Sequence, residues 1–463
     1  MTTYNSSAIS ISLLHGWLPV TVQLIAAAIL VSALGRRSRR WSLRWLPIAL
    51  LAGIGTALFL RWYVGYQGWS GHRAPWGLWI WIALTVVAGV VALAGWRNSR
   101  GWQRGGSVLA IPLCMLSAAL AVNHWVGYVP TTTAAWDLLT GAPLGGQIDA
   151  NAFRAMRDKG ERPINGTVMA VRIPDDASGF AHRDELVYLP PAWYATKPPP
   201  ALPVVMMIGG EFGHPADWPS VGAQKVLDDF ATSHGGNAPV VVWVDQSGAF
   251  ANDTECVNGV RGNAADHLTR DVVPYMVQNF GVSPDPAHWG IVGWSAGGTC
   301  ALVLTVKYPE LFSAFVDIDG QVGPNAGTRQ QTLQRLFGGD AQAWAAFDPK
   351  TVMGEHGTYR GISAWFGVSE PATAVYRAGA ANPGDVQVPP EPRPTANDEL
   401  VAVAQYLCAL SSSLGIECAV VPQPGKHDFP SAVNIFASAL PWLAGKLKTP
   451  GVPVIPLPGA PAT

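Results

Sequence analysis

Four long apolar stretches dominate the first 130 residues of the chain. Each is long enough for a helix to cross the roughly 30 Å hydrocarbon core of a bilayer. None contains Asp, Glu or Lys, and Arg61 lies close enough to one end for its side chain to reach the interface. The pattern therefore predicts four transmembrane helices, over Ser12–Leu34, Trp45–Val64, Trp76–Trp96 and Ser107–Val129.

The arginines between these stretches predict how the helices are oriented. Five lie between the first two stretches and three between the last two, whereas the turn between the second and third has only Arg61 at its edge and Arg73. By the positive-inside rule the two Arg-rich loops are cytoplasmic, so both ends of the segment face outward. We therefore expect a multi-pass plasma-membrane protein whose residues from about 130 onward are extracytoplasmic, the spans serving as an anchor.

The pattern then changes to short apolar runs that alternate with helical stretches. An antiparallel pair is expected first, followed by six more strands, at Val168–Ile173, Glu185–Leu189, Val204–Ile208, Val240–Val244, Trp289–Val292, Ala314–Ile318, Ile362–Phe366 and Glu417–Val421. Helices are expected near 221–233, 265–280, 296–307, 328–346, 397–413 and 431–446. This alternation predicts an α/β fold with a mostly parallel sheet covered by helices on both faces.

The expected organisation thus has four parts: the anchor over 1–130, a linker over 131–160, an α/β domain over 161–448 and a Pro-rich tail over 449–463. Only 13% of the 463 residues are charged, and the acidic and basic residues are distributed unevenly along the chain. Residues 1–130 hold ten Arg and no Lys or acid, so the rest carries 20 basic and 31 acidic residues. This composition excludes a single soluble globule, and it excludes a nucleic-acid binder because the basic residues lie between apolar runs.

The five cysteines predict no metal site. Cys114 falls in the fourth span, and the exported part holds an even number of cysteines, which suits an oxidising compartment. Cys408 and Cys418 would be level on a helix and the strand that returns beside it, so a disulfide between them is possible; the pairing of Cys256 and Cys300 stays open. No paired Cys-x-x-Cys or His-x-x-x-His spacing occurs, so neither zinc nor any other cofactor is expected.

The motif Gly293-Trp294-Ser295-Ala296-Gly297 carries the candidate chemistry. It follows an expected strand and opens an expected helix, which is the setting of a nucleophile elbow. The small residues on either side permit the sharp turn that exposes a nucleophilic hydroxyl, and the helix N-terminus favours developing negative charge. Ser295 is therefore the expected nucleophile.

The other catalytic residues are expected in loops that follow later strands. His427 lies after the last expected strand and is the expected base, whereas His356 precedes a strand. Glu370 lies in the loop after Ile362–Phe366 and is the expected acid, with Asp398 at the start of the next helix as the alternative. Asp317 and Asp319 are interpreted as carboxylates that order a loop rather than as metal ligands.

Two backbone N–H groups are expected to form the oxyanion hole. One belongs to Ala296, directly after the nucleophile. The other is expected in Gly209-Gly210-Glu211-Phe212-Gly213, where small residues let the chain approach a substrate, and Glu211 N–H is the favoured donor.

These motifs together resemble the putative-esterase branch of the α/β-hydrolases, which includes esterase D and the antigen 85 mycolyltransferases, and in particular its membrane-anchored actinobacterial members. The resemblance covers about Gly166 to Leu447. It rests on segments that include Val187-Tyr188-Leu189-Pro190-Pro191-Ala192-Trp193, Gly209-Gly210 through Asp217-Trp218, the elbow at Ser295, Asp253-Thr254-Glu255-Cys256, Gly262-Asn263-Ala264-Ala265-Asp266-His267-Leu268 and Gly425-Lys426-His427. Antigen 85 proteins have Met after the nucleophile and no multi-span anchor, so transfer to trehalose is not implied.

The expected function is that of a membrane-anchored serine esterase which cleaves a carboxylic ester, of an envelope lipid or a related acyl compound, through a Ser-His-Glu triad. The alternative from the same chemistry is an acyltransferase that passes the acyl group to a sugar or lipid hydroxyl. A third reading, a non-catalytic binding module on a hydrolase fold, is disfavoured by the presence of both Ser295 and His427.

Overall fold

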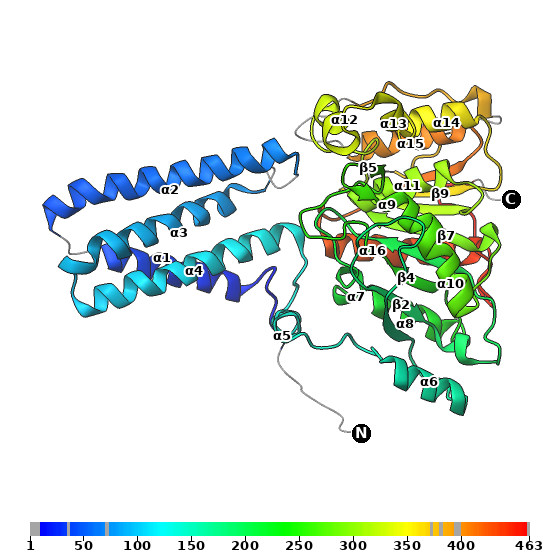
Figure 1. The fold of residues 1–463 in the computed structure, drawn as a ribbon, viewed down its shortest axis with the longest axis horizontal. Helices are drawn as coiled ribbons and strands as arrows, with labels where there is room; N and C mark the ends of the chain where they lie inside the picture. Colours follow the sequence, from blue (N-terminus) through cyan, green and yellow to red (C-terminus); the bar gives the residue numbers. More distant parts are fainter. Residues whose placement is uncertain are drawn as a thin grey trace. The chain divides into compact units, whose positions relative to one another are not determined.

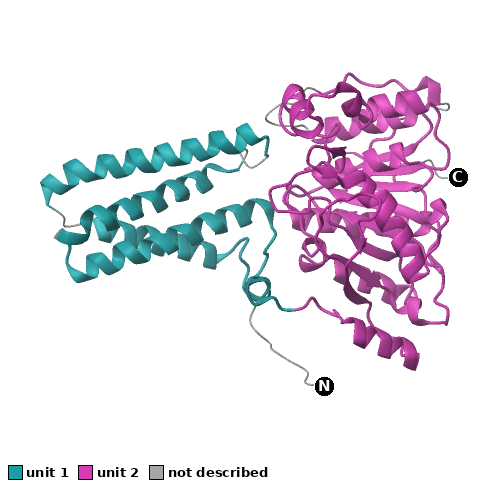
Figure 2. Ribbon diagram, in the orientation of Figure 1, with its two compact units in different colours: residues 1–142 teal, residues 143–463 magenta. Residues whose placement is uncertain are grey.

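The computed structural model describes residues 10–34, 38–69, 74–370, 374–378, 383–392 and 400–460. The chain divides into two compact units, Met1–Ala142 and Pro143–Thr463 (Figures 1 and 2). Each unit is described separately below.

The first unit is built from long helices. Within its described residues, four are long and apolar enough to cross a membrane: α1 (Trp17–Leu34), α2 (Arg39–Gln67), α3 (Trp76–Gly95) and α4 (Gly101–Val126). Each corresponds to one of the four predicted spans. Helix α4 packs against both α1 and α3, and α3 packs against α2.

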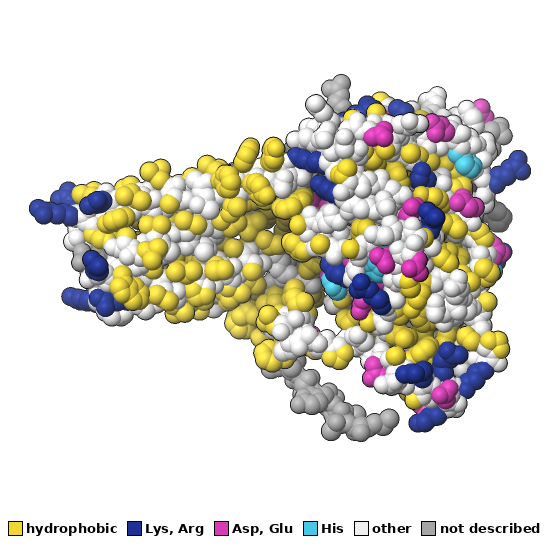
Figure 3. Space-filling view, viewed as in Figure 1, with side chains coloured by type: hydrophobic (Ala, Val, Ile, Leu, Met, Phe, Trp, Pro, Cys, Tyr) yellow, Lys and Arg dark blue, Asp and Glu magenta, His cyan; other side chains and the backbone are white. Residues whose placement is uncertain are grey.

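The packing within this unit places small residues inside and large apolar residues outside. Ala26, Ala88 and Ala110 are fully buried, and a side chain at Gly53 would strike the Ala83 carbonyl oxygen of the neighbouring helix. By contrast Leu93 is 83% exposed, and apolar side chains cover the flanks of the helices (Figure 3). Small residues between helices and large apolar ones outside are typical of helices that face lipid, because lipid is as apolar as a leucine side chain.

A short helix follows the fourth long helix. Helix α5 (Thr132–Thr140) begins where the Thr131 side chain accepts a hydrogen bond from Ala134 N–H. Its side chains Trp136, Leu138 and Leu139 are exposed. The N–H of Leu13 donates to the carbonyl of Pro130, so the segment before α1 and the segment after α4 meet in this unit.

The second unit is centred on a mixed sheet. In the described part of the chain this sheet has eight strands in the order β1-β2-β4-β3-β7-β8-β9-β10. Strand β2 pairs antiparallel with β1 and β4, and all later neighbours are parallel. The strands are β1 (Thr167–Val171), β2 (Glu185–Leu189), β3 (Val204–Ile208), β4 (Val240–Trp243), β7 (Trp289–Trp294), β8 (Ala314–Ile318), β9 (Ser363–Ser369) and β10 (Glu417–Gln423).

Helices cover both faces of this sheet. Alternate residues of a strand point to opposite faces, so the contacts of residues on one strand show what covers each face. On β7, a side chain at Gly290 would meet Leu443 of α16 and Leu447 directly after this helix, whereas one at Gly293 would strike α11. The helices and helical turns of this unit are α6 (Ala150–Lys159), η3 (Pro191–Tyr194), α7 (Asp217–Ser220), α8 (Ala223–Ser233), α9 (Ala264–Asp266), the π-helix η4 (His267–Val272), α10 (Val273–Phe280), η5 (Pro286–His288), α11 (Ala296–Lys307), α12 (Arg329–Phe337), α13 (Ala341–Ala345), α14 (Pro349–His356), η6 (Pro383–Asp385), α15 (Leu400–Ser413) and α16 (Phe429–Lys446). The unit therefore has the predicted α/β-hydrolase architecture.

The differences from the predicted elements are local. Helix α6 lies in the predicted linker, α14 and the small hairpin of β5 (Asn258–Gly259) and β6 (Gly262–Asn263) were not predicted, and the expected helix at 328–346 is divided into α12 and α13. Gly338 and Gly339, both with positive φ, end α12 and cause this division. Strand β9 continues to Ser369, three residues beyond its predicted end, because its last residues pair with the equally extended β10.

Two disulfides join elements of this unit within the described residues. Cys408 on α15 bonds Cys418 on β10, as the level positions of these residues in the sequence suggested. Cys256 bonds Cys300 on α11, the pairing that the sequence left open. Cys114 is a free, buried residue of α4.

Candidate active site

Ser295 lies at a sharp turn between β7 and α11. Its backbone has φ 57° and ψ −121°, a conformation that L-residues rarely adopt. The turn needs glycines, since a side chain at Gly293 would strike the Gly297 carbonyl and one at Gly297 would strike the carbonyls of Ile208 and Gly209. The N–H of Ser295 donates to Ile318 O at 2.8 Å, which ties the turn to β8.

His427 meets this serine from a loop 132 residues further along the chain. Its Nε2 lies 3.0 Å from Ser295 Oγ, within hydrogen-bond distance. The imidazole packs beside the Trp294 ring, with centroids 5.2 Å apart, and Trp294 in turn packs on Phe429. Asp428 caps α16 by accepting a hydrogen bond from Ser431 N–H, which fixes the loop that carries His427. The structure thus brings together the predicted nucleophile and base.

The acid beside His427 is Asp319, and the prediction that Glu370 occupies this place does not match the geometry. Asp319 Oδ2 lies 3.4 Å from His427 Nδ1, and its side chain is fully buried. Its carboxylate accepts hydrogen bonds from both the N–H and the hydroxyl of Ser369, the last residue of β9. Asp319 has φ 53°, and its N–H donates to Gly367 O, so the turn after β8 aims the carboxylate at the histidine.

The prediction differs from the structure because the acid follows β8 rather than β9. Glu370 follows β9, as expected, but the structure uses the end of that strand to supply hydrogen-bond donors through Ser369. The carboxylate itself comes from the end of β8, one strand closer to the nucleophile in the sheet. Glu370 is half-buried next to Ser369, and Asp398 lies outside the described residues. The sequence signal for Asp319 was its place directly after a buried strand.

Loop 208–213 lies next to Ser295. A side chain at Gly210 would come within 3.5 Å of Ser295 Cβ. The carbonyls of this loop are held by side chains: Trp218 Nε1 donates to Ile208 O at 3.0 Å, and Gln246 Nε2 donates to Gly209 O at 3.2 Å and Gly210 O at 3.1 Å. Because N–H and C=O point in opposite directions across a trans peptide, the Gly210 carbonyl directed at Gln246 turns the Glu211 N–H the other way.

A buried ion pair supports the same loop. The Arg183 guanidinium makes two hydrogen bonds to Asp245, at 2.8 and 2.6 Å, and one of 2.6 Å to the Gly213 carbonyl, and the Arg183 N–H donates a third to Asp245 at 2.7 Å. Burial alone would raise the pKa of Asp245, but the guanidinium of Arg183 lowers it below its ordinary value. The carboxylate therefore stays charged, and the pair fixes the far end of the loop. A bidentate pair of this kind is geometrically specific.

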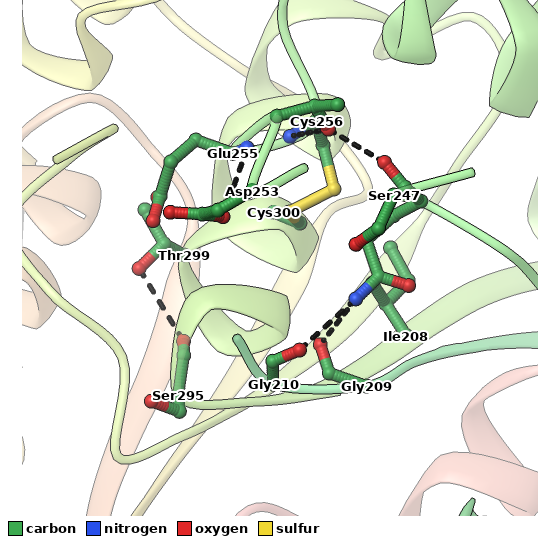
Figure 4. Close-up of a disulfide and its surroundings, with 12 residues drawn as sticks. Ile208, Gly209, Gly210, Ser247, Asp253, Glu255, Cys256, Ser295, Thr299 and Cys300 are labelled. Carbon is green, nitrogen blue, oxygen red and sulfur yellow. Dashed lines mark hydrogen bonds between the residues drawn. A yellow bond between two sulfur atoms is a disulfide. The ribbon is translucent and has the colours of Figure 1, made fainter. Parts of the chain in front are cut away.

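The Cys256–Cys300 disulfide fastens another loop to the helix that begins at the nucleophile. Figure 4 shows the loop with Asp253 and Glu255 on the same side of α11 as Thr299, one turn after Ser295. Glu255 and Cys256 both have positive φ, at 51° and 53°. Burial and the nearby charges of Asp253 and Glu211 raise the pKa of Glu255 well above its ordinary value.

A second carboxyl with a raised pKa belongs to Asp317, two residues before the acid of the site. Asp317, on β8, is buried, and its Oδ1 accepts a hydrogen bond of 2.9 Å from Gly320 N–H. Burial, together with the nearby charge of Asp319, raises the pKa of Asp317 to about 8. Asp317 is therefore largely protonated at neutral pH. The sequence interpretation of Asp317 as a loop-ordering group agrees with its bond to Gly320, whereas for Asp319 it was incomplete.

The middle of the chain is similar to known proteins. Residues 182–378 match the model of the family described as "Putative esterase". An uncharacterized protein of Corynebacterium glutamicum is 39% identical over 211 residues, which make up 44% of this chain and 48% of that protein. The match thus spans about half the length of this curated relative.

Solved structures are similar at lower identity. A ferulic acid esterase is 14% identical, with a TM-score of 0.44, over 61% of this chain and 99% of its own. An S-formylglutathione hydrolase from Agrobacterium tumefaciens is 17% identical, with a TM-score of 0.44, over 62% of this chain and 97% of its own. MPT51 of Mycobacterium tuberculosis is 16% identical, with a TM-score of 0.38, over 60% of this chain and 100% of its own.

The assignment of the acid predicts different effects for two conservative substitutions. Asp319→Asn should lower kcat for a simple ester by about 10³- to 10⁴-fold, because the amide cannot stabilise an imidazolium and favours the wrong tautomer. Glu370→Gln, the matched control, should change kcat less than about threefold, since surface changes away from the reacting groups have small effects. Steady-state kinetics and melting temperatures of both variants test this. An inactive Glu370→Gln beside an active Asp319→Asn would return the acid to Glu370.

Proposed function

We propose, from the match of residues 182–378 to the model of the Putative esterase family, that this chain is a serine carboxylic-ester hydrolase. The observation that carries the proposal is the alignment of three side chains. His427 presents Nε2 to Ser295 Oγ at 3.0 Å and Nδ1 to Asp319 at 3.4 Å. This is the arrangement of a nucleophile, a general base and an orienting carboxylate.

The proposed reaction proceeds through an acyl-enzyme. Ser295 Oγ attacks the ester carbonyl while His427 Nε2 takes its proton, and Asp319 stabilises the imidazolium that forms. The N–H groups of Glu211 and Ala296 are proposed to stabilise the oxyanion, since Glu211 N–H points away from Gln246 and Ala296 opens α11 with an N–H that has no partner within the helix. His427 then returns the proton to the leaving alcohol. A water molecule, activated by the same histidine, releases the acid and restores Ser295.

The proposed substrate has an apolar acyl chain. Phe212, next to Glu211 in the loop beside the nucleophile, stacks on Phe250 with ring centroids 5.0 Å apart. Phe250 is 70% exposed, so its ring and that of Phe212 present apolar surface next to the oxyanion loop. An aromatic surface that begins at the oxyanion loop suits the methylene groups of a lipid ester. The membrane-type helices of the first unit favour a substrate of the cell envelope.

The proposed location of the hydrolase unit is outside the cytoplasm. The exposed arginines Arg39, Arg40, Arg97 and Arg100 lie at the ends of the long helices, in the two loops predicted to be cytoplasmic, and one end of the helical unit is rich in basic side chains (Figure 3). The two disulfides of the second unit support the same side, because disulfides persist in oxidising compartments.

The first prediction of this proposal concerns the nucleophile. Ser295→Ala should abolish covalent labelling by a fluorophosphonate probe and reduce ester turnover by at least about 10³-fold, since only the attacking group is removed. Labelling and turnover are measured on full-length protein in detergent, with circular dichroism as the control for folding. A Ser295→Ala protein that still reacts would place the nucleophile elsewhere, and an unreactive wild-type protein would favour a binding module. Product analysis with and without an alcohol acceptor separates hydrolysis from acyl transfer.

The second prediction concerns the acyl chain. Phe250→Ser should lower kcat/KM for esters of long-chain acids about tenfold while leaving acetyl esters within about twofold, because truncating an apolar contact removes roughly 1–3 kcal/mol of discrimination. Val260→Ser, which changes a residue 65% exposed on the β5–β6 turn, is the matched control and should leave the chain-length profile unchanged. Equal profiles for wild type and Phe250→Ser would exclude an acyl-binding role for this surface.

The third prediction concerns orientation. A reporter active only outside the cytoplasm should be active when fused after Asp137, and a reporter active only in the cytoplasm should be active when fused at Arg39. The reason is that the arginine-rich loops stay on the cytoplasmic side. Western blots of the fusions control for expression. The reverse pattern would place the hydrolase unit in the cytoplasm and remove envelope lipids as substrates.

A further inference from the structure

A buried cluster of histidine and carboxylate side chains lies at the start of β2. In the sheet, β4 and β3 separate β2 from β7, the strand that leads to Ser295. Its members are His182, Glu185 and His267, whose ligand-type atoms all lie within 4.8 Å of one another. Glu185 Oε1 is the meeting point, at 2.8 Å from His182 Nδ1 and 3.0 Å from His267 Nε2. All three side chains are at most 1% exposed.

We propose that these three side chains bind one divalent transition-metal ion, with Zn²⁺ as the species whose preferences they meet. Two imidazoles and one carboxylate form a ligand set that zinc accepts in proteins. An ion about 2 Å from each ligand atom requires ligand atoms about 3–4 Å apart. His182 Nδ1 also lies 2.8 Å from the Arg183 carbonyl oxygen, so binding requires the His182 ring to turn from this contact toward the ion. No sequence motif predicted this site, because its ligands do not follow a paired short spacing.

The first support is an orienting carboxylate. Asp271 Oδ2 lies 3.4 Å from His267 Nδ1, while Asp271 Oδ1 accepts a hydrogen bond of 2.9 Å from Ala177 N–H. A histidine that binds a metal through one nitrogen typically donates its other N–H to a carboxylate or carbonyl. His267 and Asp271 both belong to the π-helix η4, a rare local conformation that is frequent at functional sites.

The second support is how closely the two imidazoles lie. The rings of His182 and His267 stack with centroids 4.1 Å apart. His182 Nδ1 and His267 Nε2 both lie within 3.0 Å of Glu185 Oε1, so one ion can reach a nitrogen of each ring together with this carboxylate.

The third support is an oxygen without a partner. Glu185 Oε2 is buried and has no hydrogen-bond partner among the described residues. A buried carboxylate oxygen left unpaired costs free energy, whereas a carboxylate that binds a metal through both oxygens leaves neither unsatisfied. Glu185 would then complete a four-coordinate site with no position open to solvent, which is the form of a structural rather than a catalytic metal site.

The proposed ion would link segment 182–185, which leads into β2, to η4. Its removal should therefore lower stability without changing the geometry of the triad, which lies at the ends of β7, β8 and β10. The site is independent of the proposed esterase activity, since its ligands do not include Ser295, His427 or Asp319.

The test is the metal content of the full chain, expressed without a polyhistidine tag in zinc-supplemented medium and purified in detergent. Elemental analysis should find about one zinc per chain in the wild type and in His234→Gln, a control histidine outside the cluster. Glu185→Gln and His267→Gln should each retain less than about a tenth of that amount. Circular dichroism establishes that the variants are folded.

A second measurement on the wild type keeps the test decisive if the variants fail to fold. A strong chelator should remove the zinc and lower the melting temperature, added Zn²⁺ should restore it, and Co²⁺ should give the visible absorption of a four-coordinate site. Wild-type protein with less than about a tenth of an equivalent of metal, whose melting temperature neither chelator nor Zn²⁺ changes, would overturn the proposal. The cluster would then be a hydrogen-bonded network neutralised by protons.

Discussion

The active site depends on one constraint, the left-handed backbone of Ser295. A serine with φ 57° is strained, and the strain persists only because its surroundings fix the turn on every side. Strand β8 accepts its N–H, and the carbonyls of Ile208 and Gly209 lie where a side chain at Gly297 would be. The turn therefore brings the hydroxyl, the first N–H of α11 and the loop after β3 to one point.

Around this point the buried carboxyl groups have different partners. Asp319 accepts hydrogen bonds from Ser369, and Asp245 accepts them from Arg183. Burial instead raises the pKa of Asp317 to about 8 and raises that of Glu255 as well. Burial thus disfavours the charged form where no cation pairs with the carboxyl group, as at Asp317, whereas Arg183 favours the charged form of Asp245.

The two units of the chain follow opposite packing rules. In the first, alanines are buried between helices and large apolar side chains are exposed, as in Ala88 and Leu93. In the second, large apolar residues such as Trp289 and Phe366 form the core. The difference reflects the surroundings that each composition suits, because burying a large apolar side chain gains free energy only when the alternative is water.

Local patterns in the chain were sufficient for the four long helices, the positions of the parallel strands along the chain, and the pairing of Ser295 with His427. These depend on hydrophobic periodicity and on a turn whose residues are adjacent in sequence. The acid was different: Asp319 and Glu370 both follow buried strands, and only the register of β8 beside β9, with Ser369 donating to Asp319, selects between them. The Cys256–Cys300 bond and the cluster around Glu185 likewise join segments that are far apart in sequence. Such contacts depend on how loops from different strands meet at the sheet. The pattern of residues within a single segment does not encode which distant segment it will contact.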